Sequence, residues 1–100
     1  MIRRMLDSKK IMKEIENKKK EIRKYGVKKM GLFGSFAKGK QNKNSDIDFL
    51  IEVDKIDAEK FFALLFMLEK MFGREVDLVN IKNLRPELKH VKKEAKYVKI

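Results

Sequence analysis

The chain of 100 residues contains no cysteine and a single histidine, His90. Without cysteine there can be no disulfide, no thiolate-bound zinc and no cysteine nucleophile, and a lone histidine cannot build a metal site. No apolar run is long enough to cross a bilayer, and residues 1–7 become charged too soon for a secretory signal. We therefore expect a cytoplasmic protein, although the lack of cysteine alone does not fix the compartment.

The length and composition favour one small domain, residues 1–100, with a modest core. Hydrophobic residues make up 43% of the chain, which is enough for such a core but leaves no room for a second one. No internal repeat, low-complexity tract or linker divides the sequence.

Basic residues outnumber acidic ones, with 26 lysines and arginines against 15 aspartates and glutamates, which gives a net charge of +11. Clustered lysines bind phosphate backbones without sequence preference, so weak nucleic-acid binding is one interpretation. Many lysines are interleaved with glutamates, as in residues 18–21 and 92–94, a pattern typical of solvated helix faces. We favour this second interpretation and keep a nucleic-acid surface as the alternative.

The periodicity of apolar residues predicts alternating helices and strands. Helices are predicted at residues 8–24, with Ser8 as the cap and three isoleucines on one apolar stripe, and at residues 57–71, with Asp57 as the cap. A glycine follows the end of each. A last helix is predicted with Pro86 in its first turn and Val98 among its apolar residues. Strands are predicted at residues 28–33, 46–53 and 75–80, with a short helical turn after the first. The predicted fold class is α/β (α+β): a small mixed sheet with helices packed on one face and the acids on the other.

The helix predicted at residues 57–71 is apolar on nearly every side. Its phenylalanines, leucines and methionines leave no polar stripe for water, so we expect most of it to lie in the core. Large exposed apolar patches mark interaction sites, and a partner or dimer surface on part of this helix is therefore the alternative.

Two acidic residues, Asp46 and Asp48, begin the second predicted strand. Because successive strand residues point to opposite faces and Ile47 and Phe49 take the apolar face, both carboxylates project to the same side. They stand roughly 7 Å apart, at about 3.3 Å of rise per residue, and repel each other unless a cation lies between them. Mg²⁺ is held through one or two carboxylates plus substrate phosphates, so it fits better than a closed structural metal site.

A Gly-Ser turn, Gly34 and Ser35, ends the first predicted strand. Gly34 lets the backbone approach a ligand closely, and Ser35 offers a hydroxyl and a backbone N–H. The free N–H groups at the start of a helical turn favour an anion such as a triphosphate. Alone, such a dipeptide marks an ordinary turn, so its meaning depends on the acids that follow after ten residues.

A third acid, Asp77, lies on the third predicted strand, on the face opposite to Val76 and Leu78. If this strand lies beside the strand of Asp48, the carboxylates meet. They could then hold two metal ions, or hold one ion while Asp77 takes a proton from an attacking hydroxyl. Alone, Asp77 could equally be a surface acid.

The combination of Gly34 and Ser35, ten residues, Asp46 and Asp48, and then a distal Asp77 resembles the hallmark of the DNA polymerase β-type nucleotidyltransferases, specifically the minimal nucleotidyltransferases (MNT). The resemblance implies a polymerase β-like nucleotidyltransferase core. It also implies metal binding and catalysis by the three aspartates, and triphosphate binding by the Gly-Ser turn. Mg²⁺, as one or two ions, and ATP as the nucleotide donor are the implied cofactors.

The resemblance covers most of the chain from Met30 onward, since residues 84–95 are also similar to the closing helix of MNT proteins. The loop departs from the family pattern, because Lys38 and Lys40 stand where members often carry arginine and glutamate. Lys38 keeps the positive charge without the bidentate fork of arginine, and Lys40 reverses a sign. The departure concerns loop contacts and acceptor preference, while all three acids are present.

The MNT resemblance further implies an antitoxin that adenylylates a tyrosine of its partner, a HEPN-type ribonuclease toxin, and thereby silences it. The partner would then also be the substrate. Two alternatives stay open: an antitoxin that neutralises its toxin by occlusion alone, and a nucleotidyltransferase that acts on RNA ends or a small molecule. Homo- and hetero-oligomers are compatible with each of these.

Overall fold

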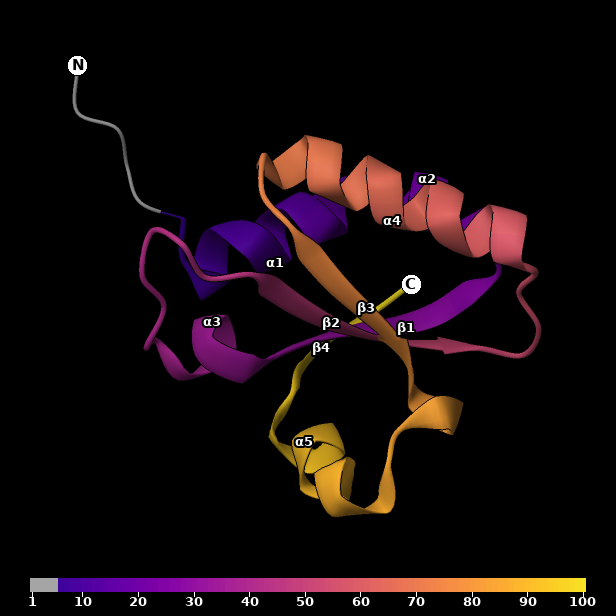
Figure 1. The fold of residues 1–100 in the computed structure, drawn as a ribbon. Helices are drawn as coiled ribbons and strands as arrows, with labels where there is room; N and C mark the ends of the chain where they lie inside the picture. The colour runs from indigo at the N-terminus through magenta and orange to yellow at the C-terminus, as the bar shows by residue number, and fades with distance from the viewer. Residues whose placement is uncertain (1–5) are drawn as a thin grey trace.

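The computed structural model describes residues 6–100, so most of the segment considered above for a secretory signal lies outside the described residues. Four strands form one mixed sheet (Figure 1): β1 (Val27–Phe33), β2 (Ile47–Val53), β3 (Val76–Asn80) and β4 (Lys96–Lys99). Their order across the sheet is β3–β2–β1–β4. β1 runs antiparallel to β2 and β4, whereas β2 and β3 are parallel. The predicted small mixed sheet and its first three strands are confirmed.

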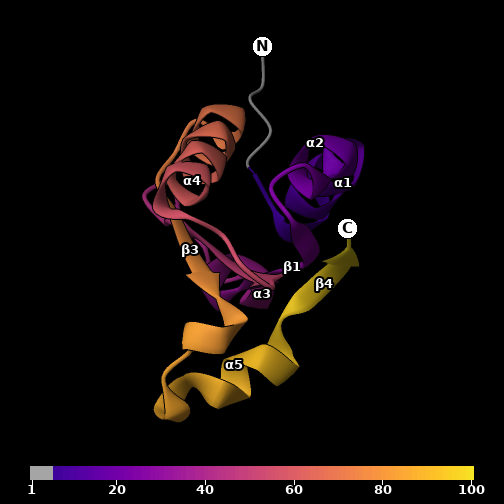
Figure 2. The same ribbon diagram turned by 90° about the vertical axis from the view of Figure 1, so that its right-hand side faces the viewer.

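Three helices cover one face of the sheet: α1 (Ser8–Asn17), α2 (Lys19–Arg23) and α4 (Ala58–Phe72) (Figure 2). α4 connects β2 to β3 and runs back along the sheet, which is why these two strands are parallel. Among residues 6–100, no helix combines the length and apolar character needed to cross a membrane. The core between the helices and the sheet is formed chiefly by Ile11, Ile15, Ile22, Met30, Leu32, Ile47, Phe49, Ile51, Leu64 and Leu68.

The opposite face of the sheet carries only short elements. α3 (Gly34–Lys38) follows β1 directly. After β3, the short helical turns η1 (Ile81–Asn83) and η2 (Pro86–Leu88) lead into α5 (Lys89–Glu94), which lies across the sheet from α4 (Figure 1; Figure 2). The predicted division, with helices on one face and acids on the other, holds for α1, α2 and α4, whereas the last predicted helix lies on the acidic side as α5.

The first predicted helix differs in two details. Asp7 rather than Ser8 caps it, because the Asp7 carboxylate accepts a hydrogen bond from Lys10 N at 2.9 Å. The helix is also divided at Lys18, whose backbone (φ −105°, ψ 7°) leaves the helical region. The three isoleucines of the predicted apolar stripe, Ile11, Ile15 and Ile22, are nevertheless all buried.

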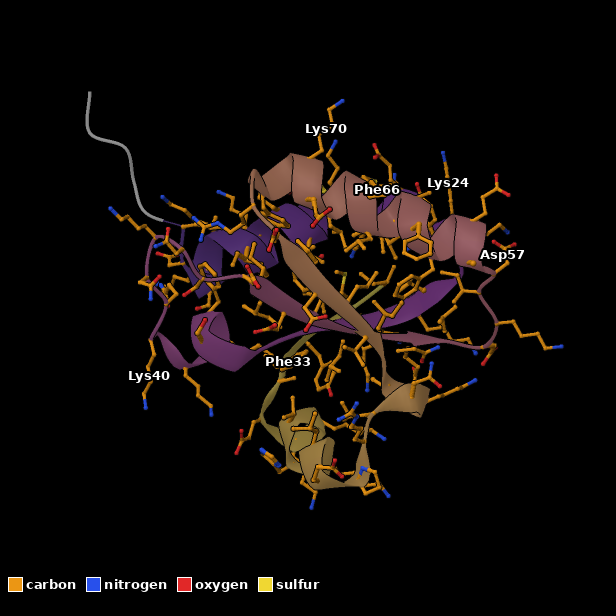
Figure 3. All side chains as sticks on the ribbon, viewed as in Figure 1. Lys24, Phe33, Lys40, Asp57, Phe66 and Lys70 are labelled. Atoms are coloured by element: carbon orange, nitrogen blue, oxygen red, sulfur yellow. The ribbon has the colours of Figure 1, made fainter. Side chains whose placement is uncertain are left out.

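α4 begins and ends where predicted but is not covered on all sides. Asp57 Oδ1 accepts from Lys60 N at 2.8 Å, and Gly73 ends the helix in a left-handed conformation. Two of its phenylalanines remain exposed, Phe62 at 51% and Phe66 at 63%, with ring centroids 6.4 Å apart. Phe66 is labelled in Figure 3. The expectation that this helix avoids water on every side is therefore wrong, because the sheet and the other helices cover only part of its circumference.

The C-terminal residues form a strand, whereas the apolar pattern predicts that they belong to the last helix. α5 ends at Glu94, and Val98 pairs with Met30 as part of β4 and is buried. The pairing covers the edge of β1, which would otherwise expose unpaired N–H and C=O groups. Tyr97 pairs with Gly31, where a Cβ would lie 2.6 Å from Tyr97 Cε1, so glycine at this position makes room for the ring.

Candidate active site

Two of the predicted acids, Asp48 and Asp77, lie directly opposite each other on adjacent strands. The parallel pairing of β2 and β3 sets them in register. Their neighbours Ile47 and Val76 are buried in the core, so both carboxylates lie on the face turned away from α1, α2 and α4. Asp46 immediately precedes β2 and is exposed. The predicted pairing of the third-acid strand with the Asp48 strand is confirmed.

Asp48 is half-buried, unlike its two acidic neighbours, which are exposed. Burial raises the pKa of Asp48 from 3.8 to about 6, with further increases from the negative charges of Asp77 and Asp46. Loss of hydration and repulsion between like charges both disfavour the ionised carboxylate. A cation bound between these groups would oppose both effects.

The Gly-Ser turn lies against these acids. Phe33, the last residue of β1, pairs with Asp48, and Gly34 follows with a left-handed φ of 74°. A Cβ at Gly34 would overlap Oδ2 of Asp48 and come within 3.0 Å of its Cγ. Ser35 is half-buried in the first turn of α3, where backbone N–H groups have no helical acceptor. The turn and the acids are neighbours in space, as their spacing predicts, and their binding roles stay predictions.

The segment that precedes Asp46 is folded by its own hydrogen bonds. Asn42 N donates to Ser45 Oγ at 2.9 Å, and Ser45 N donates to Asn42 O at 3.1 Å. Asn44 N also donates to the Asn42 side chain at 2.8 Å. The basic residues of this loop, Lys38, Lys40 and Lys43, are exposed, so its charge faces the solvent. Figure 3 shows Lys40 extending away from the protein.

Arg74 is a residue of the site that sequence reasoning missed. Its Nη1 donates to Ser45 O at 3.1 Å, one residue before Asp46. Its guanidinium lies 5.1 Å from the centroid of the Phe36 ring, which belongs to α3 next to the Gly-Ser turn. The signal that could have marked Arg74 is its position just ahead of the third-acid strand.

A small cavity adjoins the Gly-Ser turn. Its volume is about 220 Å³, and it lies between α3 and α5, with Phe33 and Gly34 on one side and Val91 and Glu94 on the other. A larger open hollow of about 890 Å³ lies beside the last residues of β3 and the start of α4, and none of the three acids lines it. None of the three acids lines the small cavity either, and it adjoins the candidate site through Gly34. The approach of α5 to this turn is a second feature that the sequence does not reveal.

The donor set of the site suits a hard divalent cation. Asp46, Asp48 and Asp77 offer carboxylate oxygens, and they lie close enough for the other two to raise the pKa of Asp48. Within residues 6–100, no three aspartate, glutamate or histidine side chains form a group that could hold a metal ion, so Asp46, Asp48 and Asp77 are not arranged as a three-carboxylate site. Mg²⁺ does not require one, because it is usually bound by one or two carboxylates together with waters and substrate phosphates. The residues present therefore fit Mg²⁺ shared with a nucleotide.

Comparisons with known proteins agree with this geometry. Residues 9–99 match the Nucleotidyltransferase domain family. The chain is 39% identical over 83 residues to the protein adenylyltransferase MntA of Thermococcus cleftensis, an alignment that covers 80% of this chain and 84% of that protein.

Two solved structures have the same fold. One, described provisionally as a minimal nucleotidyltransferase, matches with a TM-score of 0.78 at 27% identity and covers 91% of this chain and 95% of the other. A chain from a toxin–antitoxin structure with AMP-PNP matches with a TM-score of 0.68 at 28% identity, covering 82% of this chain and 70% of the other. Motif, fold and family match agree: the chain belongs to the Nucleotidyltransferase domain family.

Proposed function

We propose that this nucleotidyltransferase is a Mg²⁺-dependent protein adenylyltransferase and the antitoxin of a HEPN-type ribonuclease toxin. It would transfer AMP from ATP to a tyrosine hydroxyl of that toxin. The observation that carries the proposal is the contact of Gly34 with Asp48, which itself lies opposite Asp77. Further support comes from a relative named a protein adenylyltransferase and from a neighbouring structure of a toxin–antitoxin with AMP-PNP.

Each site residue has a distinct role in this proposal. Gly34 and Ser35 hold the triphosphate through backbone N–H groups and the serine hydroxyl. Asp46 and Asp48, with Asp77 as a further donor, hold Mg²⁺, which when bound supplies positive charge that offsets the charge on the phosphate oxygens. Asp77 also orients the acceptor hydroxyl and accepts its proton. Asp77 is exposed, so a side chain of another protein can reach it.

The proposed reaction is an in-line displacement at the α-phosphorus of ATP. The acceptor oxygen forms a bond to this phosphorus while the bond to the oxygen that bridges to the β-phosphate breaks. Pyrophosphate leaves with the bonding electrons, and the hydroxyl proton passes to the Asp77 carboxylate. The product is AMP joined to the tyrosine oxygen through a phosphodiester. The protein would encounter ATP and the toxin in the cytoplasm.

A second candidate is transfer of a nucleotide to RNA ends. The net charge of +11 and the exposed loop lysines favour it, because such surfaces attract polyanions. Turnover on RNA that falls steeply with salt, together with no transfer to protein, would support this candidate over the first.

A toxin-neutralisation assay can distinguish an antitoxin that acts by catalysis from one that acts by occlusion alone. When the protein is coexpressed with the toxin encoded beside it, we expect the wild type to restore growth and Asp46→Asn or Asp48→Asn to fail, because each lacks a metal ligand. Glu59→Gln is the matched control, since this exposed acid lies on α4, across the sheet from the site. Full neutralisation by both aspartate variants would favour a binding antitoxin instead.

A further inference from the structure

Arg74 joins segments of the site that are far apart in the sequence. Its Nη1 donates to Ser45 O at 3.1 Å, at the residue before Asp46. Its guanidinium lies over the Phe36 ring, 5.1 Å from the centroid, and thereby contacts α3, the helix that begins at the Gly-Ser turn. Arg74 itself leads into β3, the strand of Asp77. Arg74 thus connects the elements that carry the Gly-Ser turn, the first two aspartates and Asp77.

Neighbouring contacts make this connection firm. The N–H of Ile47, one residue after Asp46, donates to the backbone oxygen of Glu75 at 3.1 Å. Arg74 and Glu75 therefore hold the residues on both sides of Asp46. Phe36 is fully buried, so its ring is a fixed support for the guanidinium.

Only part of the hydrogen-bonding capacity of Arg74 is used within the protein. The Nε–H of Arg74 is buried and has no hydrogen-bond acceptor within residues 6–100. An unsatisfied buried donor costs free energy, and an apolar group of similar shape at such a place can be nearly neutral for folding. The contacts that Arg74 does make, with Ser45 O and the Phe36 ring, join two segments of the candidate site and point to a positioning role.

We propose that Arg74 is a positioning residue for nucleotidyl transfer. It fixes the Asp46 segment, which would hold the metal ion, relative to α3, which would hold the triphosphate. Without Arg74, the protein still folds, but the Asp46 segment and α3 are no longer held in a fixed position relative to each other. Lysine cannot substitute fully, because an ammonium cannot both donate to Ser45 O and lay a planar group over Phe36. This role rests on the nucleotide-binding site proposed above.

The test compares Arg74→Met and Arg74→Lys with Arg23→Met. Arg23 is a matched control because its Nε also donates to a backbone carbonyl, Ile100 O at 2.9 Å, on an exposed part of α2 remote from the acids. Calorimetry measures binding of an ATP analogue with a methylene group between the α- and β-phosphates in the presence of Mg²⁺. The KM for ATP and the thermal midpoint are measured on the same proteins.

We expect Arg74→Met to weaken analogue binding and to raise the KM for ATP by at least about tenfold, because small misplacements of reacting groups have effects of this size. Its thermal midpoint should change no more than that of Arg23→Met, and Arg74→Lys should recover only part of the loss. Wild-type binding and KM in Arg74→Met, or equal losses in the Arg23→Met control, would overturn the proposal. A wild type that binds no nucleotide would reject the proposed function, and with it this role.

Discussion

Gly34 lies so close to Asp48 that a Cβ at position 34 would overlap Oδ2 of the carboxylate. The contact arises because Phe33 pairs with Asp48 at the end of the β1–β2 ladder, after which Gly34 turns with a φ of 74° into α3. A left-handed backbone and a close approach each favour glycine, and both apply here. The turn and the acids are therefore parts of one site.

Gly34→Ala is expected to abolish nucleotidyl transfer. The added methyl group must displace the Asp48 carboxylate, and the left-handed backbone costs roughly 1–2 kcal/mol of stability in addition. Transfer of labelled nucleotide measures the activity, and urea unfolding measures the stability.

Gly39→Ala is the matched control for this variant. Gly39 has a similar φ, 70°, but nothing lies within 4 Å of a Cβ at that position. This variant should carry the same backbone strain yet keep most of its activity. Equal activity of the two alanine variants would show that the close approach of Gly34 to Asp48 is not needed for nucleotidyl transfer.

Replacing Asp46 or Asp48 with asparagine should abolish transfer while leaving the fold intact or slightly more stable. Each amide removes a carboxylate that we propose binds Mg²⁺, and with it one of the like charges that repel each other on this face. Activity assays and urea unfolding of the same preparations separate the two effects. Full activity in the double variant would contradict the proposed mechanism.

The stability of the metal-free protein should depend on pH through Asp48. Folding raises the pKa of this carboxyl from 3.8 to about 6, chiefly by burial, so the folded state binds its proton more tightly than the unfolded state does. The resulting stabilisation is fully present below pH 3.8 and is lost as the pH rises through about 6. Urea unfolding of the wild type and Asp48→Asn across this range should diverge, with the variant gaining relative stability as pH rises. Parallel curves would contradict the pKa shift.

The exposed phenylalanines of α4 should contribute little to folding stability. Phe66 is 63% exposed, whereas Phe49 is fully buried with its ring centroid 5.9 Å from that of Phe72. Alanine at Phe49 should lower the free energy of unfolding by about 3–5 kcal/mol. Alanine at Phe66 should change it by no more than about 0.5 kcal/mol. Comparable losses at the two positions, measured by urea unfolding, would mean that α4 is buried on all sides after all.

Local sequence signals predict the elements that carry the acids. Alternation of apolar residues around Asp48 and Asp77 fixes which side chains leave the core, and Asp57 and Gly73 mark the ends of α4. The parallel pairing that sets Asp48 beside Asp77 then follows from a helix that connects the two strands. These features were predictable because each depends on neighbours in the sequence.

Features that depend on distant residues were not predictable in the same way. β4 forms because the edge of β1 is available and Gly31 leaves space for Tyr97. The sequence does not reveal this strand, because the residues before it have a helical pattern of apolar side chains. Arg74 acquires its contacts only when Ser45 and Phe36 arrive from other segments. The exposed side of α4 likewise reflects how much of the helix the sheet covers, which apolar composition alone does not reveal.

The most direct test of the proposed activity is mass spectrometry of both proteins after incubation. The purified chain is mixed with Mg²⁺ and each nucleoside triphosphate in turn, with and without the protein encoded beside it. We expect the neighbour to gain the mass of AMP when ATP is supplied, to gain nothing with Asp46→Asn, and to gain it again with Gly39→Ala. No mass gain with any nucleotide, despite formation of a tight complex, would contradict adenylylation and leave a binding antitoxin.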